Sequence, residues 1–220
     1  MSVARTKQDT KIYKIEEAIK KVKAYSKEKF NSTVELHVAI NTDPKKQEQN
    51  IRFSINLPNG TGKTKKVAVL ASNKVPNADI ELSEADIDKL ASGVLRPKID
   101  FDVIVSESKF MPKLAKAAKV LGPAGVMPNP KTGTVTDDVE KAVALIKKGK
   151  VEVKNEKDAA VIHTILGKTS FEDNALVENY NEIMSNLKQN KPSKLKETLI
   201  KNAFVKSSMG PSFAVDISDL

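Results

Sequence analysis

The segment Leu57–Thr64, with the sequence LPNGTGKT, ends like a loop that binds the phosphates of a nucleotide. Such a loop requires a glycine, four residues and then Gly-Lys-Ser/Thr, placed between a strand and a helix so that backbone N–H groups surround the phosphates. The position five residues before Gly62 is a leucine, and the apolar run Val67–Leu70 predicts a strand where the helix is needed. The segment is therefore typical of a hinge at Gly60 and Gly62, with a P-loop NTPase kept as the enzyme alternative.

Side chains for other kinds of catalysis, or for metal binding, are scarce. The chain has no cysteine and two histidines, His37 and His163, which stand 126 positions apart in apparent strands. No serine or cysteine nucleophile motif accompanies either of them, so both are interpreted as partly buried structural residues. The sequence predicts no enzyme, no metal site and no cofactor.

The charge of the chain favours a polyanionic partner. Lysine and arginine number 37 against 28 aspartate and glutamate, which gives a net charge of +9 and an isoelectric point near 9.4. Within 108–131 there are five lysines and no acidic residue. Four of these form either a solvated helix face, which we favour, or a second nucleic-acid surface for tRNA or rRNA: Lys109, Lys113, Lys116 and Lys119.

Membrane association is not expected. No apolar run approaches the roughly 20 residues that span a bilayer, and the N-terminus has positive charge without the apolar core of a secretory signal. We therefore expect a cytoplasmic protein without a membrane partner.

Hydrophobic periodicity changes along the chain. Apolar residues at helical spacing predict a helix over 12–29, and alternation predicts strands over 33–40 and 51–57. The next part has apolar runs without alternation at 67–71 and 101–105, typical of strands covered on both faces. It also has predicted helices at 83–90, 112–120 and 139–149, of which the first opens on a sequence like a capping box, Ser83-Glu84-Ala85-Asp86, and the last follows Asp137 and Asp138.

The last part of the chain, like the first, combines strand-like runs with a helix. It has β-like runs at 160–166, 197–206 and 212–217 and a long helix around 176–187. Its strands supply those that the first part lacks, so residues 1–60 plus 153–220 are predicted to form a discontinuous α+β domain, an antiparallel sheet with two helices. An α/β Rossmann-like domain, 61–152, is inserted into it, with hinges near 60–64 and 151–155.

A set of segments spread over almost the whole chain carries a family resemblance. The segments are KFNSTVEL (29–36), QNIR (49–52), LPNGTGK (57–63), LGPAGVMPNPKTGTV (121–135), Ile162-His163, Gly167-Lys168 and SMGPS (208–212). In this order they resemble the bacterial form of the first-numbered protein of the large ribosomal subunit, the L-one family.

The resemblance implies a fold and a function. The family has an α+β domain made from both chain ends and an inserted Rossmann-like domain, joined by two strands that act as a hinge. Its members bind 23S rRNA as a monomer within the ribosome, and form the mobile stalk involved in release of deacylated tRNA from the exit site. Bacterial members also repress their own operon by binding an mRNA site that mimics the rRNA site.

The resemblance also implies a set of rRNA-binding residues. RNA of this kind is recognised through shape, 2′-hydroxyls and phosphates, so a hydroxyl, an apolar side chain and a glycine that permits close approach suit the contact at 208–210. The alternatives are an ordinary turn at 208–211, a core ring at position 30 and a lysine-paired carboxylate at position 35. The residues are Phe30, Thr33, Glu35, Lys154, Lys157, Ser208, Met209, Gly210 and Pro211.

This sequence departs from the family pattern at several positions. Phe53 stands where glycine is usual, Ala124 where arginine is usual, and Ser208 where threonine is usual. Lys154 and Glu156 replace an arginine and an aspartate. A lysine lacks the guanidinium fork that makes planar, bidentate contacts, so these changes bear on single contacts with the RNA.

Overall fold

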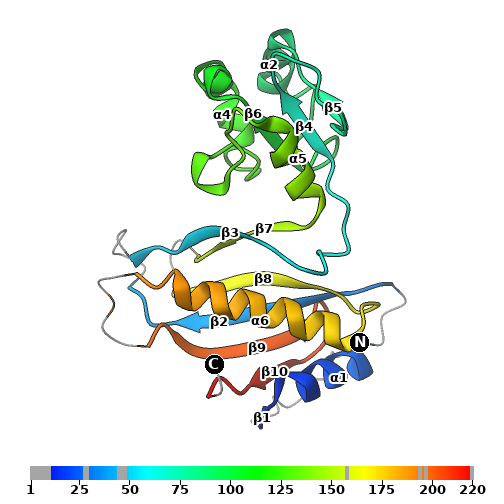
Figure 1. The fold of residues 1–220 in the computed structure, drawn as a ribbon, viewed down its shortest axis with the longest axis vertical. Coiled ribbons are helices and arrows are strands. Elements are labelled where there is room, and N and C mark those ends of the chain that lie inside the picture. Colours follow the sequence, from blue (N-terminus) through cyan, green and yellow to red (C-terminus); the bar gives the residue numbers. More distant parts are fainter. Residues whose placement is uncertain are drawn as a thin grey trace, which may run out of the picture. The chain divides into compact units, whose positions relative to one another are not determined.

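The computed structural model describes residues 11–26, 30–43, 49–156, 159–192, 195 and 198–218. The chain divides into two compact units, Met1–Gly62 together with Val151–Leu220, and Lys63–Lys150 (Figure 1). The second unit is thus two residues shorter at each end than the insert 61–152 that the sequence indicates. Both units combine helices with strands, and none of the helices described is long and apolar enough to cross a membrane.

The first unit is built on a five-stranded sheet. Its strands are β1 (Ile12–Tyr13), β2 (Thr33–Ile40), β8 (Val161–Lys168), β9 (Ile200–Ser207) and β10 (Ser212–Val215). Their order is β1-β10-β9-β2-β8, and neighbours are antiparallel except for the parallel pair β1 and β10. A strand from the first part of the chain, β2, therefore lies between two strands from the last part.

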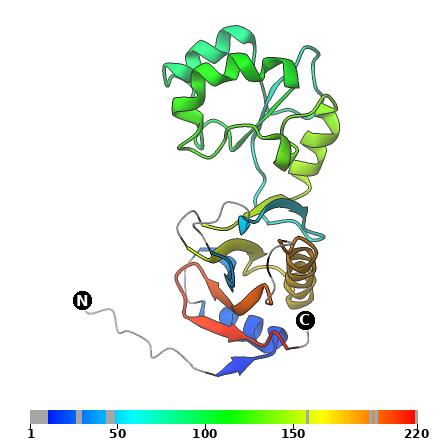
Figure 2. The ribbon, with the colours of Figure 1, turned by 90° about the vertical axis from the view of Figure 1, so that its left-hand side faces the viewer.

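Two helices pack on one face of this sheet (Figures 1 and 2). They are α1 (Ile15–Tyr25) and α6 (Asp173–Gln189). Along β2, Val34, Leu36 and Val38 are fully buried in one core with apolar residues of both helices, whereas Thr33 and Glu35 are only partly buried. Because successive side chains of a strand point to opposite faces, the sheet has a core face and an open face that no described helix covers.

The strand predicted over 51–57 is confirmed as β3 (Arg52–Asn56). It lies outside the five-stranded sheet and pairs with β7 (Lys150–Lys154). Ile55 and Val153 of this pair are buried in the same core. The helix expected over 12–29 begins only at Ile15, since the residues before it pair with β10 as β1. Alternation predicts a half-buried strand, but it does not identify the partner strand.

The second unit contains a parallel sheet in the order β5-β4-β6. Its elements are β4 (Val67–Leu70), β5 (Ile80–Glu81), β6 (Val103–Ser106), α2 (Glu84–Ala91) and α5 (Val139–Lys147). Every residue of β4 is buried, as expected for a strand covered on both faces. Ala68 and Leu70 pack in a cluster with α2, and Val67 and Val69 pack in another with α5.

The helix predicted over 112–120 is replaced by a series of short helical turns. They are η2 (Ser108–Phe110), α3 (Met111–Leu114), η3 (Ala115–Ala117) and α4 (Ala118–Leu121); a further turn, η4 (Pro130–Thr132), follows later. Phe110, Leu114, Ala117 and Leu121 are all buried in one cluster. Their spacing is that of a helix face, but the spacing of apolar residues does not show the change between 3₁₀ and α hydrogen bonding.

The capping box predicted at the start of α2 is confirmed, with aspartate in place of the usual glutamate. The backbone N–H and the hydroxyl of Ser83 donate to Asp86 Oδ2 at 2.9 and 2.6 Å. The bond from Lys89, followed by those from Ser83, holds the pKa of Asp86 well below its usual range. Asp138 lies at the N-cap of α5 as expected, but its carboxylate pairs with Lys141 at 2.9 Å and not with the helix N-terminus.

The connection from β3 to β4 is fastened to α6 by one buried side chain, that of Asn179. Its Oδ1 accepts from the N–H of Asn59 at 3.2 Å, and its Nδ2 donates to the carbonyl oxygens of Gly60 at 3.1 Å and Leu166 at 2.7 Å. Asn179 is fully buried. A single amide thus joins the helix, the connection between the units and strand β8.

We expect Asn179→Leu to destabilise the first unit by about 2–4 kcal/mol, because it leaves buried carbonyl oxygens without a donor. Urea unfolding followed by tyrosine fluorescence measures this, since the three tyrosines of the chain all belong to the first unit. Asn186→Leu on the same helix is the control, because within the described part of the chain its amide bonds to Glu182 alone. Equal losses in the two variants would contradict the prediction.

Candidate functional site

The two glycines of LPNGTGKT belong to a connection between strands and not to a phosphate loop. Gly60 and Gly62 have φ angles of +67° and +71°, a region that glycine adopts without steric cost. The chain then enters β4, and Lys63 Nζ pairs with Asp102 at 2.9 Å. A phosphate bound here would lack the helix N-terminus that a nucleotide loop supplies.

The turn after β9 lies against the start of β2. The backbone N–H of Ser208 donates to the carbonyl oxygen of Thr33 at 3.0 Å, and its hydroxyl donates to Glu35 Oε1 at 2.9 Å. The other oxygen of Glu35 is 3.9 Å from Lys206 Nζ. The structure therefore brings together three of the residues predicted to bind RNA, although 173 positions separate Glu35 from Ser208.

Two large apolar side chains that are close in sequence to these residues are exposed. Phe30 is 58% exposed and Met209 is 77% exposed. The alternative of a core ring at Phe30 is therefore wrong, and Met209 does not reach the core either. Exposed apolar side chains can mark an interaction site where they form a contiguous patch.

Lys168 joins the same group because of a bulge in β8. Two consecutive residues of β2 lie opposite Gly167 and Ile165, so Leu166 has no partner on β2. A bulge re-aims the side chains that follow it, and Lys168 Nζ donates to Thr33 Oγ1 on the open face at 2.8 Å. Sequence reasoning gave Lys168 no role, although its place in the resembling segment 167–168 was a signal. The turn cluster is defined as Phe30, Thr33, Glu35, Lys168, Ser208 and Met209.

Gly210 packs closely against the side chain of Ser207 within the turn. A Cβ at this position would lie 2.2 Å from Ser207 Oγ, and the N–H of Gly210 donates to the Ser207 carbonyl oxygen at 3.1 Å. The sequence-based interpretation was that a glycine here lets RNA approach the backbone. The structure gives a reason inside the protein, since a larger residue would first displace the buried hydroxyl of Ser207.

Lys154 lies away from the turn cluster. It is exposed at the end of β7, and the adjacent Asn155 forms a bridge with Ile162 near the start of β8. Lys168 is at the opposite end of that strand, and a strand rises ~3.3 Å per residue, which places the two ends about 20 Å apart. Lys157 lies outside the described residues.

His37 and His163 lie directly opposite each other on the open face. Their Nδ1 atoms face each other within hydrogen-bond distance, and their ring centroids are 4.7 Å apart. Burial, followed by the neighbouring His163, lowers the pKa of His37, although Glu35 at 3.5 Å from its Nε2 opposes this. Among the described residues no group of three metal-ligating side chains is present. Sequence reasoning expected structural histidines but not that they would form a pair.

The lysines expected along one helix face lie on the broken segment 108–121. Lys109 pairs with Glu107 at 2.7 Å and Lys113 pairs with Glu84 at 2.6 Å. Lys116 and Lys119 are at the surface. Ion pairing of this kind favours the interpretation of a solvated face, and a second nucleic-acid surface stays a prediction.

The sequence model of the ribosomal protein L1p/L10e family matches residues 22–211. The chain belongs to this family. It is similar to large ribosomal subunit protein uL1 of Mesoplasma florum, with 46% identity over 214 residues that cover 94% of this chain and 92% of the relative. The uL1 of Mycoplasma capricolum subsp. capricolum is 43% identical over 210 residues, with 94% and 92% covered. That of Prochlorococcus marinus (strain MIT 9211) is 41% identical over 226 residues, with 100% and 94% covered.

Membership in the L1p/L10e family confirms the resemblance found in the sequence. It makes the chain a structural component of the large subunit of the cytoplasmic ribosome, with a part in translation, and not an enzyme. The NTPase alternative is therefore excluded, in agreement with the strand that follows Thr64.

We expect Gly210→Ala to destabilise the first unit by about 1–3 kcal/mol through overpacking against Ser207. Ser207→Ala alone should be nearly neutral, because its buried hydroxyl has no hydrogen-bond partner among the described residues. The double variant should recover most of the loss, as measured by urea unfolding with tyrosine fluorescence. A double variant as unstable as Gly210→Ala would contradict the steric explanation.

The depressed pKa of His37 predicts a loss of stability in mild acid. The unfolded chain binds this proton near the ordinary pKa of 6.5, and the folded chain binds it only at lower pH. Stability is therefore full above that value and falls as the pH drops below it. Urea midpoints of the first unit should fall between about pH 7.5 and about pH 5 in the wild type, and less in His37→Gln. Identical pH profiles would contradict the assignment.

Proposed function

We propose that the chain binds 23S rRNA directly through the turn cluster on the open face of the first unit. The observation that carries this proposal is the exposure of Phe30 and Met209 beside the hydrogen-bonded groups of Thr33, Glu35 and Ser208. An apolar ring and a thioether can pack on bases and riboses, while the polar groups can meet 2′-hydroxyls in the wide minor groove of RNA.

The hydrogen bond to Glu35 makes the Ser208 hydroxyl an acceptor for this contact. Its hydroxyl hydrogen points to Glu35, at 2.9 Å, so the lone pairs of its oxygen are available to accept from a 2′-hydroxyl. Glu35 in this arrangement orients Ser208, and its negative charge is moderated by Lys206. This removes the main electrostatic objection to a carboxylate at an RNA surface.

Phosphate contacts would extend the interface along the first unit. The net charge of +9 favours a polyanion, and Lys154 is exposed about 20 Å from the turn cluster along β8. Together with Lys157, it would neutralise phosphates on a second part of the same RNA. Pro211 would limit the freedom of the turn that carries Met209.

On the same proposal, the protein is a monomer in the mobile stalk that takes part in release of deacylated tRNA from the exit site. The second unit would be a Rossmann-like domain, which the parallel order β5-β4-β6 with clusters on both faces supports. Connections near 60–64 and 151–155 would act as hinges, the first through the left-handed glycines Gly60 and Gly62. Lys116 and Lys119 would be the groups available for tRNA.

The same surface would also repress translation of the protein's own operon. An mRNA site that copies the shape of the rRNA site would meet the same hydroxyls and apolar side chains, so the two RNAs would compete. An excess of the rRNA fragment should therefore displace the operon mRNA in a gel shift, and simultaneous binding of both would contradict a shared surface.

We expect Met209→Asp to reduce affinity for a 23S rRNA fragment by at least about tenfold, because it removes an apolar contact and adds negative charge. Val94→Asp is the matched control, since Val94 is 69% exposed on the second unit and the charge change is the same. The measurement is a gel shift over a salt series. Equal effects of the two variants would show that Met209 acts only through charge.

The same salt series distinguishes phosphate contacts made by lysines from contacts made by uncharged side chains. Lys154→Ala should flatten the slope of log affinity against log salt by about 0.7–0.9 for the lost phosphate. Ser208→Ala should lower affinity and leave the slope unchanged, because its hydroxyl carries no charge.

A further inference from the structure

Lys168 carries a positive charge, and its hydrogen-bond partners among the described residues are uncharged. Its Nζ donates to Thr33 Oγ1 at 2.8 Å and lies 3.5 Å from the carbonyl oxygen of Asn31. Both partners are uncharged, and among the described residues no carboxylate forms an ion pair with it. An ammonium group has three donors, so at least one remains for a ligand. Phe30 and Met209, which belong to the same turn cluster, are exposed.

The stem of the same side chain lies against the connection between the units. A Cβ added to Gly62 would be 2.7 Å from Lys168 Cγ and 3.0 Å from the ring of Phe171. Gly62 is the last residue of the first unit before the chain enters the second. The position of this connection therefore limits where the methylene chain of Lys168 can lie, and through it the ammonium group.

Asn179 forms hydrogen bonds to two backbone segments near Lys168, the bulge in β8 and the connection at Gly60. Its amide group donates to the carbonyl oxygen of Leu166, the unpaired residue of the bulge that turns Lys168 to the open face. The same Nδ2 donates to the carbonyl oxygen of Gly60, two residues before Gly62. One buried residue thus bonds both to the bulge that precedes Lys168 and to the connection that contains Gly62.

We propose that Lys168 binds a phosphate of the RNA and that Thr33 and Gly62 position it, so that the first connection between the units acts on the RNA site. The inference rests on the proposed RNA-binding function. A phosphate would take the free donor of the ammonium group, while the adjacent ribose and base contact the exposed apolar side chains. Because coupling between sites is reciprocal, bound RNA would in turn restrict the connection at Gly62.

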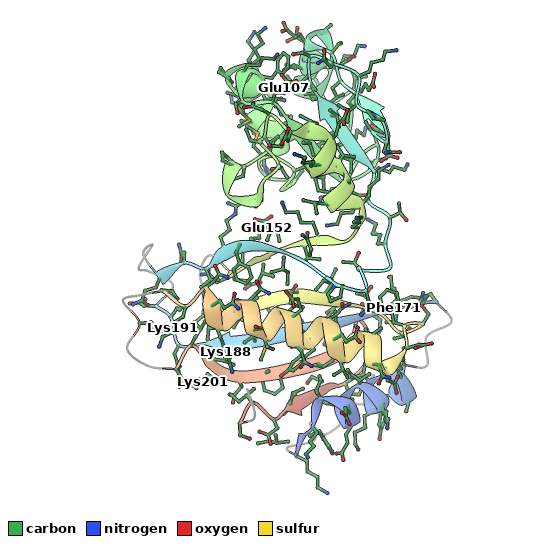
Figure 3. The ribbon with its side chains drawn as sticks, viewed as in Figure 1. Glu107, Glu152, Phe171, Lys188, Lys191 and Lys201 are labelled. Atoms are coloured by element: carbon green, nitrogen blue, oxygen red, sulfur yellow. The ribbon has the colours of Figure 1, made fainter. Side chains whose placement is uncertain are left out.

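The first experiment measures binding of a 23S rRNA fragment by the full chain over a salt series. Lys168→Met should flatten the salt slope by about 0.7–0.9, and Thr33→Val should lower affinity with the slope retained. Lys201→Met is the matched control, because Lys201 is exposed on β9 and lies at the opposite end of the first unit from Phe171 (Figure 3). If Lys168→Met binds like Lys201→Met while Met209→Asp still loses affinity, this inference fails and the proposed function stands.

The second experiment tests the connection. Gly62→Ala should lower RNA affinity several-fold, whereas Gly60→Ala, with a similar left-handed φ, should lower it much less. Tyrosine-monitored unfolding selects conditions in which both variants are folded. In a double-mutant cycle, Gly62→Ala should have little further effect on Lys168→Met, because both act through the same ammonium group. Additive effects, or equal losses for Gly60→Ala and Gly62→Ala, would overturn the coupling.

Discussion

The buried amide of Asn179 is the interaction on which the arrangement of the first unit depends. It satisfies a carbonyl oxygen in the bulge of β8 and another in the connection to β4, while its own backbone belongs to α6. A buried polar group without a partner is costly, so these three segments are held in a fixed arrangement. The orientation of the Lys168 side chain, the backbone path of LPNGTGKT and the position of Gly62 all depend on this arrangement.

The candidate site exists only because distant parts of the chain pair with each other. β2 lies between β8 and β9, and this places Thr33 beside both Lys168 and Ser208, which are 135 and 175 positions away. The helices occupy the core face, which leaves the polar half of β2 available for recognition. Unfolding any of these strands would therefore remove the site as a whole, and its residues should act cooperatively in binding.

Net charge alone does not locate the site. The second unit has the conspicuous lysines, but Lys109 and Lys113 are paired with glutamates, and Lys63 is paired with Asp102. In the turn cluster the important features are one lysine with uncharged partners and two exposed apolar side chains. Surface ion pairs contribute little to stability, yet they reduce the charge that a second polyanion surface would offer.

The sequence by itself determined those local elements whose apolar pattern is regular, such as β2 and α6, because period-two and helical patterns follow directly from backbone geometry. It was sufficient for the buried half of β2, for the Ser83–Asp86 cap and for the failure of LPNGTGKT as a phosphate loop, and the resembling segments pointed to Ser208 and Met209. Only the tertiary structure decided that β3 pairs with β7, that the histidines meet, that Gly210 is fixed by Ser207 and that Lys168 faces the open side. These depend on which strand lies beside which, and on one unpaired residue in β8, and neither is encoded in the periodicity of a single segment.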